Sequence, residues 1–290
     1  MSQFTGLFSG LTTIDIQYFV DSFPVPNRKV KTDPPEILVG GPATNAAVAF
    51  AYLNEKTFLI SALGNNAFSG FVAGDLTKNR VTHFDLIPNQ RQNAVMASVV
   101  TSGNNGDRTV FTHHPHQIEP EVNPEKLLAE TEPNIVLMDG FYPEFNTGCA
   151  QIAKKYGIPL VLDCGSWKKQ YSSLLPFTEV AICSADFLPP GCNSHESVFS
   201  FLREKGVKKI AISRGEKSLL FQDEKGRGEV AIEKTNVMDT LGAGDFFHGA
   251  FCYYFLLYDG DFVKALKYAS RIATFSCQYK GTREWLNYTI

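Results

Sequence analysis

Asp239-Thr240-Leu241-Gly242-Ala243-Gly244-Asp245 is the stretch of this sequence that decides the fold, and the apolar run 246–257 follows it directly. Small residues before an apolar, helix-forming run predict a helix whose first backbone N–H groups have no partner inside the helix. Such N–H groups, together with the positive end of the helix dipole, bind anions. The stretch therefore predicts an anion-binding helix N-terminus at Gly242, Ala243 and Gly244.

A carboxylate, Asp245, stands at the same predicted helix start. Phosphoryl transfer needs N–H donors for the oxygens of the moving group and a base that orients and deprotonates the attacking hydroxyl. The pattern predicts that Gly242, Ala243 and Gly244 supply the donors and that Asp245 is the catalytic base. The competing interpretation is a glycine-rich turn in which Asp245 only caps the helix.

The rest of the chain indicates an α/β protein. Apolar stretches that alternate with helical ones from about residue 125 indicate a parallel sheet covered on both faces. The predicted strands are 6–16, 36–39, 57–63, 135–138, 160–163, 180–183 and 210–213, and a hairpin spans 219–232. The predicted helices are 43–53, 69–79, 125–130, 146–156, 195–205, 245–257 and 261–279.

Two β-rich pieces, near 15–40 and 85–112, do not fit this alternation. The second piece contains predicted strands at 84–87, 94–101 and 108–112, and turn residues at 102–107 predict a hairpin between the last two. We expect these pieces to leave the main sheet and form a lid, over about residues 12–40 and 85–115, within a single domain spanning 1–290.

Composition excludes several classes of protein. The 290 residues are 44% hydrophobic and 20% charged, and the net charge of −3 comes without any basic block, so nucleic acid is not an expected partner. No run approaches the about 18 apolar residues of a membrane span, and no signal peptide is expected. The six cysteines form no C-x-x-C pair and lie mostly in apolar runs, which predicts reduced thiols and a cytoplasmic location.

The stretch 239–245 resembles the signature of the ribokinase-like (PfkB) carbohydrate kinase family. Two further family patterns precede it in family order, Gly40-Gly41-Pro42-Ala43-Thr44-Asn45-Ala46-Ala47 and Gly10-Leu11-Thr12-Thr13-Ile14-Asp15. The resemblance covers nearly the whole chain. It implies a three-layer α/β/α sandwich with a mainly parallel sheet and a small β lid. It also implies ATP-dependent phosphorylation of a primary hydroxyl of a small sugar, such as a ketohexose or ribose.

The same resemblance implies the sugar ligands. Asp15 would chelate two sugar hydroxyls, Gly41 would let the sugar approach the backbone, and Asn45 would bind a hydroxyl. Within the family the chain is most similar to ketohexokinases, whose Gly-Asn-Arg-Thr turn resembles the segment around Arg108. Pro42 stands where those enzymes have Asn, so one sugar contact is absent because proline has neither a side-chain amide nor a backbone N–H.

The nucleotide side is implied by a loop and a helix. The segment 213–218 resembles the family's nucleotide loop and implies ATP contacts from Ser213 and Gly215, while Ala273 and Cys277 stand where the last helix lines the adenine pocket. Mg²⁺ is expected as a cofactor. Its ligands stay unassigned, because Ser184-Ala185-Asp186 replaces the Asn-x-x-Glu motif that most members carry and ketohexokinases also lack.

The resemblance also suggests two further partners. One is a monovalent cation, K⁺, near Asp239, because family members often bind such an ion beside the signature loop. The other is a second copy of the chain, in a homodimer formed through the lid.

Other interpretations stay open. A nucleoside kinase of the adenosine type shares the fold and the signature, and an apolar base pocket in place of hydroxyl ligands would identify it. A catalytically weak sugar-binding regulatory protein would need no base, so Asp245 argues against it. A dehydrogenase is disfavoured because the first strand lacks the glycine fingerprint. His113, His114 and His116 are interrupted by Pro115 and are interpreted as solvated lid residues rather than metal ligands.

Overall fold

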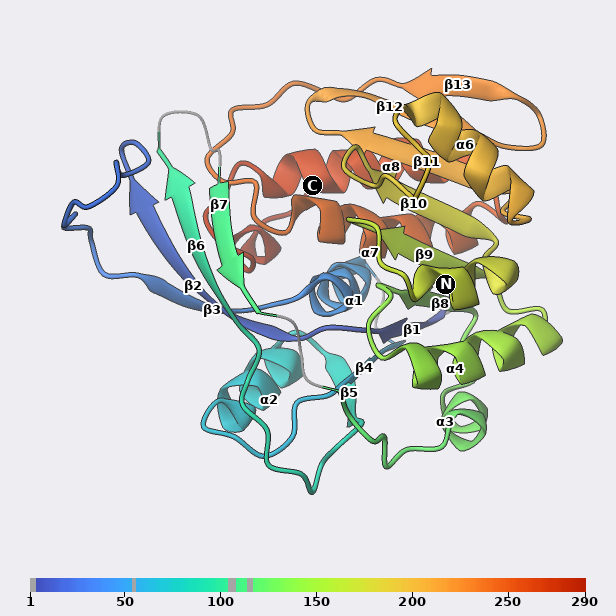
Figure 1. Ribbon diagram of the computed structural model, residues 1–290, viewed down its shortest axis with the longest axis horizontal. Coiled ribbons are helices and arrows are strands. Elements are labelled where there is room, and N and C mark those ends of the chain that lie inside the picture. The colour runs from blue at the N-terminus through green and yellow to red at the C-terminus, as the bar shows by residue number, and fades with distance from the viewer. Residues whose placement is uncertain (1–3, 54–55, 104–107, 114–116) are drawn as a thin grey trace.

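A nine-stranded sheet forms the centre of the protein in the computed structural model, which describes residues 4–53, 56–103, 108–113 and 117–290 (Figure 1). Its strand order is β13-β12-β11-β10-β9-β8-β1-β4-β5. The strands from β11 to β5 are parallel to one another: β1 (Thr5–Ser9), β4 (Lys56–Ser61), β5 (Val81–Asp85), β8 (Ile135–Met138), β9 (Leu160–Cys164), β10 (Val180–Ser184) and β11 (Lys209–Arg214). β12 (Lys217–Gln222) and β13 (Arg227–Val230) extend one edge as an antiparallel hairpin.

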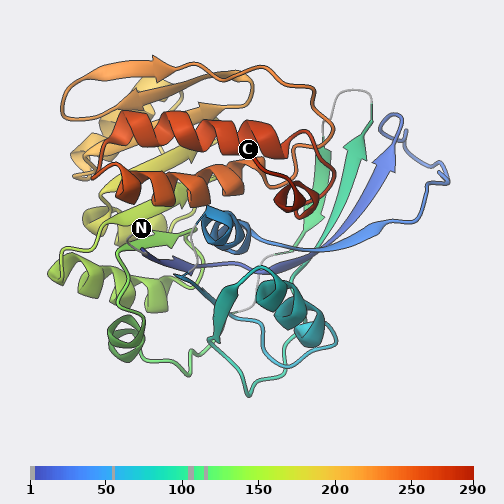
Figure 2. The same ribbon diagram turned by 180° about the vertical axis from the view of Figure 1, so that it is seen from behind.

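Side chains of the parallel strands alternate between two apolar cores, as the two-residue period of a strand requires. Phe8 and Leu59 enter one core, and their neighbours Leu7 and Ile60 enter the other. Helices cover both faces (Figures 1 and 2). The first core lies under α1 (Pro42–Leu53), α2 (Ser69–Lys78), α7 (Ala243–Leu257) and α8 (Phe262–Ser276). The second lies under α3 (Pro124–Thr131), α4 (Pro143–Lys155), α5 (Tyr171–Leu174) and α6 (His195–Glu204). The predicted α/β/α fold class is confirmed.

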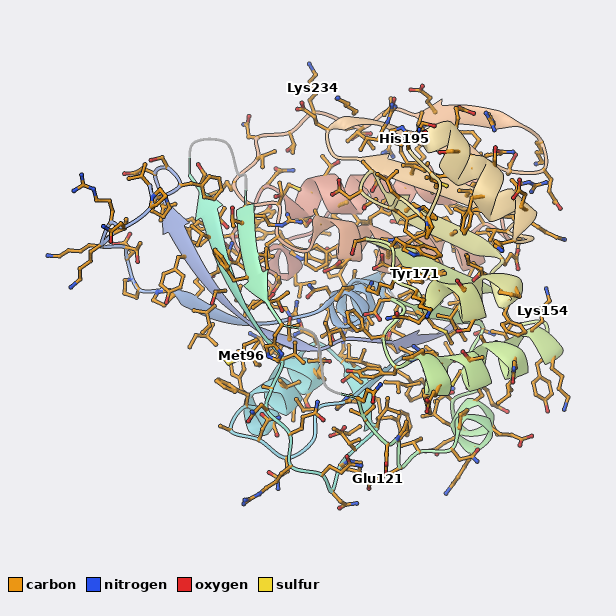
Figure 3. The ribbon with its side chains drawn as sticks, viewed as in Figure 1. Met96, Glu121, Lys154, Tyr171, His195 and Lys234 are labelled. Carbon is orange, nitrogen blue, oxygen red and sulfur yellow. The ribbon has the colours of Figure 1, made fainter. Side chains whose placement is uncertain are left out.

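A second, four-stranded sheet projects from the main body, and we call it the lid (Figure 1). It contains β2 (Thr13–Val20), β3 (Glu36–Gly40), β6 (Met96–Ser102) and β7 (Arg108–Thr112), in the order β3-β2-β6-β7. The chain passes from β1 to β2 in three residues, so the single strand predicted over 6–16 is divided between the two sheets. In Figure 3, Met96 lies where β6 leaves the main body.

The structure differs from the sequence predictions in a few elements. The strand predicted at 84–87 corresponds to β5, which pairs with β4 and therefore belongs to the main sheet rather than to the lid. α5 and the short 3₁₀ helices at Leu175–Phe177 and Glu284–Asn287 are absent from the predictions, because such short helices carry no periodic pattern. The turn residues 104–107, with His114 and His116, lie outside the described residues.

Two observations concern the protein's surroundings. Within the described ranges, the structure contains no helix with the length and apolar character needed to cross a membrane. All six cysteines are free thiols, and four of them, Cys149, Cys164, Cys183 and Cys252, are buried.

Candidate active site

The N-terminus of α7 lies at the centre of the candidate site. The helix begins after Gly242, which has a left-handed φ of 78°, and its first i→i−4 bond runs from Phe246 N to the carbonyl of Gly242 at 2.8 Å. The N–H of Ala243 donates to Thr240 O at 3.2 Å, whereas Gly244 is exposed. The helix therefore presents its positive end and an exposed backbone to an anion, although the Ala243 amide already has a partner.

Close packing of α7 on α1 brings the predicted base to the predicted sugar ligand. A Cβ added to Gly249 would lie 2.0 Å from the carbonyl oxygen of Ala46, so only glycine permits this approach of the two helices. As a result Asn45 on α1 donates through Nδ2 to Oδ2 of Asp245 at 2.8 Å. This hydrogen bond occupies one of the two carboxylate oxygens of Asp245.

The surroundings of Asp245 shift its pKa toward neutrality. Burial raises the pKa of Asp245 to about 7, and the nearby carboxylate of Asp163 acts in the same direction. The Asn45 hydrogen bond and the charges of His248 and Arg108 oppose this rise. A base whose pKa lies near neutrality is substantially ionised at neutral pH and is still basic enough to accept a proton.

This pKa predicts the pH dependence of the reaction. Asp245 must be ionised to accept a proton, so kcat/KM should be constant above pH 7 and fall by about tenfold per unit as the pH drops below it. Initial rates between pH 5 and 9, with unfolding followed at each pH, measure this limb. An acid limb absent down to pH 5 would contradict the assignment.

Two carboxylates at the ends of neighbouring strands were not among the predicted site residues. Asp163 lies in β9, 3.5 Å from Nε2 of His248, whose Nδ1 lies 2.6 Å from Gly244 O. Asp139 follows β8 and receives the N–H groups of Leu11, Ala43 and Phe141. Burial raises the pKa of Asp139 to about 6.

The sequence contains a pattern from which Asp139 and Asp163 could have been predicted as site residues. Both directly follow apolar residues of predicted parallel strands, and the carboxyl ends of such strands form binding sites in α/β folds.

Three predicted sugar ligands lie near one another. Asp15 on β2 is buried and accepts a hydrogen bond from Thr13 Oγ1 at 2.6 Å. Burial raises the pKa of Asp15, and the Thr13 hydrogen bond and the charge of Arg283 oppose the rise. Arg283 also donates to Asn45 at 2.9 Å. Gly41 has a φ of 102°, and a Cβ there would lie 2.2 Å from Leu11 O, so the backbone at this corner has room for no side chain.

The lid is attached to the loop that precedes α7. Arg108 on β7 donates through Nη1 to the carbonyl oxygen of Thr240 at 2.6 Å and to its hydroxyl at 2.8 Å. Gln17 on β2 donates to Oδ2 of Asp239 at 2.7 Å. Arg108, predicted as a sugar ligand, therefore contacts the loop in this structure, and it connects the lid to the loop before α7.

Asp239 organises the same loop. Its carboxylate accepts from Gln17 Nε2, from Gly281 N at 2.9 Å and from Leu241 N at 2.9 Å. The residue predicted to lie near a monovalent cation thus has three N–H donors of its own, and the cation stays a prediction.

A pocket of about 380 Å³ lies at the ends of β10 and β11. It brings together the predicted ATP residues Ser213 and Gly215 with the segment 184–186, and its other lining residues are His195, Arg214 and Lys217. His195 is the first residue of α6 and is labelled in Figure 3. Ala273 and Cys277 do not line this pocket. Instead Cys277 O accepts the N–H of Met238 at 2.8 Å, so the end of α8 contacts the segment before the signature loop.

Aromatic residues pack together just beyond the end of β10, beside this pocket. Phe187 is buried against Trp167, with ring centroids 5.6 Å apart, and against Tyr171 at 5.7 Å. Among the described residues, no group of three or more His, Cys, Asp or Glu side chains could enclose a metal. Mg²⁺ that binds together with a nucleotide commonly needs only one or two protein carboxylates beside phosphates and water. Asp186, in the pocket, is one such carboxylate.

Comparison with known proteins gives consistent matches along the chain. The sequence profile described as "pfkB family carbohydrate kinase" matches residues 7–287. A deoxyribokinase from Salmonella typhi is 23% identical, over 94% of this chain and 92% of its own. The Arabidopsis thaliana ribokinase solved with ribose and ATP has a TM-score of 0.78 at 19% identity, covering 99% of this chain and 100% of that one. An E. coli structure solved with ATP and Mg²⁺ also has a TM-score of 0.78 at 18% identity, covering 98% of this chain and 96% of that one.

Proposed function

This chain belongs to the pfkB family of carbohydrate kinases, and on that premise we propose that it transfers the γ-phosphoryl group of ATP to a primary hydroxyl of a small sugar with Asp245 as base. The observation that carries this proposal is the position of Asp245 at the start of α7. There it accepts a hydrogen bond from Asn45, and burial raises its pKa to about 7. The chain is an ATP-dependent carbohydrate kinase, and the substrate and residue roles are our proposal.

The proposed step is an in-line displacement at phosphorus. The sugar hydroxyl forms a bond to the γ-phosphorus, the bond from that phosphorus to the bridging oxygen of ADP breaks, and the hydroxyl proton passes to Asp245. The exposed backbone at Gly244 and the positive end of α7 stabilise the oxygens of the transferring group. Ala243 contributes less in this arrangement, because its N–H donates to Thr240 O.

The sugar is proposed to bind between the lid and the start of α7. Asp15 is buried and its carboxylate is suited to chelating two hydroxyls, while a sugar contact at Gly41, whose Cβ position is filled by Leu11 O, stays a prediction. Asn45 holds the base and lies beside the same space. The relatives reported above are named for ribose and deoxyribose, and preference for a ketohexose stays a prediction.

ATP is proposed to reach the start of α7 from the pocket that contains Ser213 and Gly215. Mg²⁺ would be held by the nucleotide phosphates and by Asp186, and it would neutralise charge on the β- and γ-phosphate oxygens. Adenine contacts from Ala273 and Cys277, and K⁺ near Asp239, stay predictions.

A homodimer through the lid is also proposed. Support comes from exposed apolar side chains on the two edge strands of the lid, Ile37 on β3 and Val110 and Phe111 on β7, because exposed apolar side chains favour contact with another protein surface. The free thiols support the proposed cytoplasmic location.

A lid attached to the phosphate-binding loop predicts that Arg108 suppresses hydrolysis. Removal of its two bonds to Thr240 in Arg108→Ala should loosen the lid and admit water, which competes with the sugar hydroxyl for the phosphoryl group. The ratio of ATP hydrolysis to sugar phosphorylation should rise by about fivefold or more, which corresponds to the about 1 kcal/mol typical of a lost hydrogen bond. Arg28→Ala, in the exposed segment between β2 and β3, is the matched control. An unchanged ratio in Arg108→Ala would refute this role of the lid.

A panel of acceptors tests the proposed function. ATP turnover would be measured with ribose, deoxyribose, fructose, 2-keto-3-deoxygluconate and adenosine at equal concentrations. We expect phosphorylation of a free sugar and weak turnover with adenosine. Turnover confined to adenosine would identify a nucleoside kinase, and sugar binding without turnover would identify a regulatory protein.

A further inference from the structure

A continuous hydrogen-bonded chain runs from α2 to the proposed base. Asp75 on α2 receives Nε and Nη2 of Arg283, with Nη2 3.0 Å from Oδ2, and the two side chains are only 15% and 16% exposed. Nη1 of Arg283 donates to Oδ1 of Asn45 at 2.9 Å and to Thr282 O at 3.0 Å. Asn45 Nδ2 then donates to Asp245 at 2.8 Å. Four segments distant in sequence thus meet in one chain of contacts.

The donors and acceptors along this run of hydrogen bonds determine how the side-chain amide of Asn45 is oriented. An asparagine side chain has an oxygen that only accepts and a nitrogen that only donates, and a half-turn exchanges them. A guanidinium only donates, so the face of Asn45 toward Arg283 must be its oxygen. The nitrogen consequently faces Asp245, where it can donate to an ionised carboxylate.

We propose that Arg283 is a positioning residue for the reaction: it sets the Asn45 amide so that Asn45 holds the ionised Asp245 carboxylate and leaves the other carboxylate oxygen for the sugar hydroxyl. This inference rests on the proposed function, because it assumes that Asp245 is the base. Arg283 is suited to the task because its planar fork contacts Asp75 with one edge and Asn45 with the other. Asp75 holds the guanidinium in place, since two bonds to one carboxylate fix both its position and its plane.

Loss of the contact between Arg283 and Asn45 should change both the reaction rate and its pH dependence. Besides Asn45, the charges of Asp163 from β9, His248 from α7 and Arg108 from β7 act on the pKa of Asp245. Of these contacts, only the Asn45 hydrogen bond depends directly on Arg283. When the amide is free to turn, its oxygen can face the carboxylate, and the ionised form of Asp245 loses a donor.

The test compares Arg283→Met and Arg283→Lys with the wild-type chain. We expect Arg283→Met to lower kcat by about ten- to a hundredfold, the size of effect that misplacement of a reacting group produces, with KM for ATP unchanged. The acid limb of the pH profile should move to higher pH. Arg283→Lys keeps the cation beside Asp75 but lacks the fork, so it should fold and show the same two changes. Arg271→Met, which removes an exposed arginine paired with Glu233 on the surface, is the control.

A double-variant comparison separates positioning from a structural role. If Arg283 acts through Asn45, Arg283→Met should cost no further activity in an Asn45→Ala background. If the activity losses caused by the two single substitutions multiply in the double variant, the inference is overturned. It would also be overturned if folded Arg283→Lys had the wild-type kcat and pH limb while Asp245→Asn was inactive. Full activity of Asp245→Asn would instead overturn the proposed function itself.

Discussion

Replacement of Asp245 by asparagine is expected to lower kcat by about 10² to 10⁴, the range that loss of a general base typically costs. Asparagine has nearly the same shape, so the packing of α7 on α1 and the ligand contacts should persist. What disappears is the acceptor for the hydroxyl proton. Affinity for ATP and sugar should change by less than about twofold, as measured by calorimetry, because the contribution of the base arises in the transition state.

The matched control for this experiment is Asp261→Asn. Asp261 caps the N-terminus of α8 by accepting the N–H of Lys264 at 3.0 Å, and asparagine caps helices equally well. The control should keep wild-type turnover. Wild-type kcat in Asp245→Asn would show that another group accepts the proton.

Replacement of Asp15 by alanine is expected to weaken sugar binding at least tenfold for each hydroxyl that loses its acceptor. Hydrogen bonds to a charged group contribute about 1.5–3 kcal/mol each, and two such bonds are proposed here. ATP affinity should stay nearly unchanged, because Asp15 lies on the lid strand β2 and the proposed nucleotide pocket lies at the ends of β10 and β11. Titration of sugar and of ATP into each variant, followed by calorimetry, measures the two affinities separately.

Asp21→Ala serves as the control for Asp15→Ala, because Asp21 is an exposed aspartate that directly follows the same strand. It should bind sugar like the wild type. Asp15 is buried, so thermal unfolding must show that Asp15→Ala is folded at the temperature of the titration. Equal sugar affinity in a folded Asp15→Ala variant would refute the assigned role.

The sequence predicted the fold well where one local pattern determines each element. The buried parallel strands are short apolar runs, and β8 occupies the predicted residues Ile135–Met138. The division between β1 and β2 could not be predicted in the same way. Both strands are apolar, and only pairing partners far along the chain assign β1 to the main sheet and β2 to the lid.

The candidate site shows the same distinction between local and distant contacts. The predicted base, Asp245, belongs to one contiguous motif whose residues determine a helix start. Arg283 and Asp75 lie outside every motif, and their contact spans 208 residues of sequence. The position of Arg108 against Thr240 also depends on how the lid folds over the loop. Such contacts arise from packing between elements, and a single sequence carries no periodic signal for them.

Label transfer from ATP tests the central claim most directly. ATP labelled in its γ-phosphate would be mixed with the wild-type chain or Asp245→Asn, each with the preferred sugar, under single-turnover conditions. We predict that label enters a sugar phosphate in the wild type, and that Asp245→Asn binds both substrates but transfers label about 10² to 10⁴ times more slowly. Label that appears only as inorganic phosphate in the wild type, or equal transfer rates in the two proteins, would contradict phosphoryl transfer to a sugar with Asp245 as base.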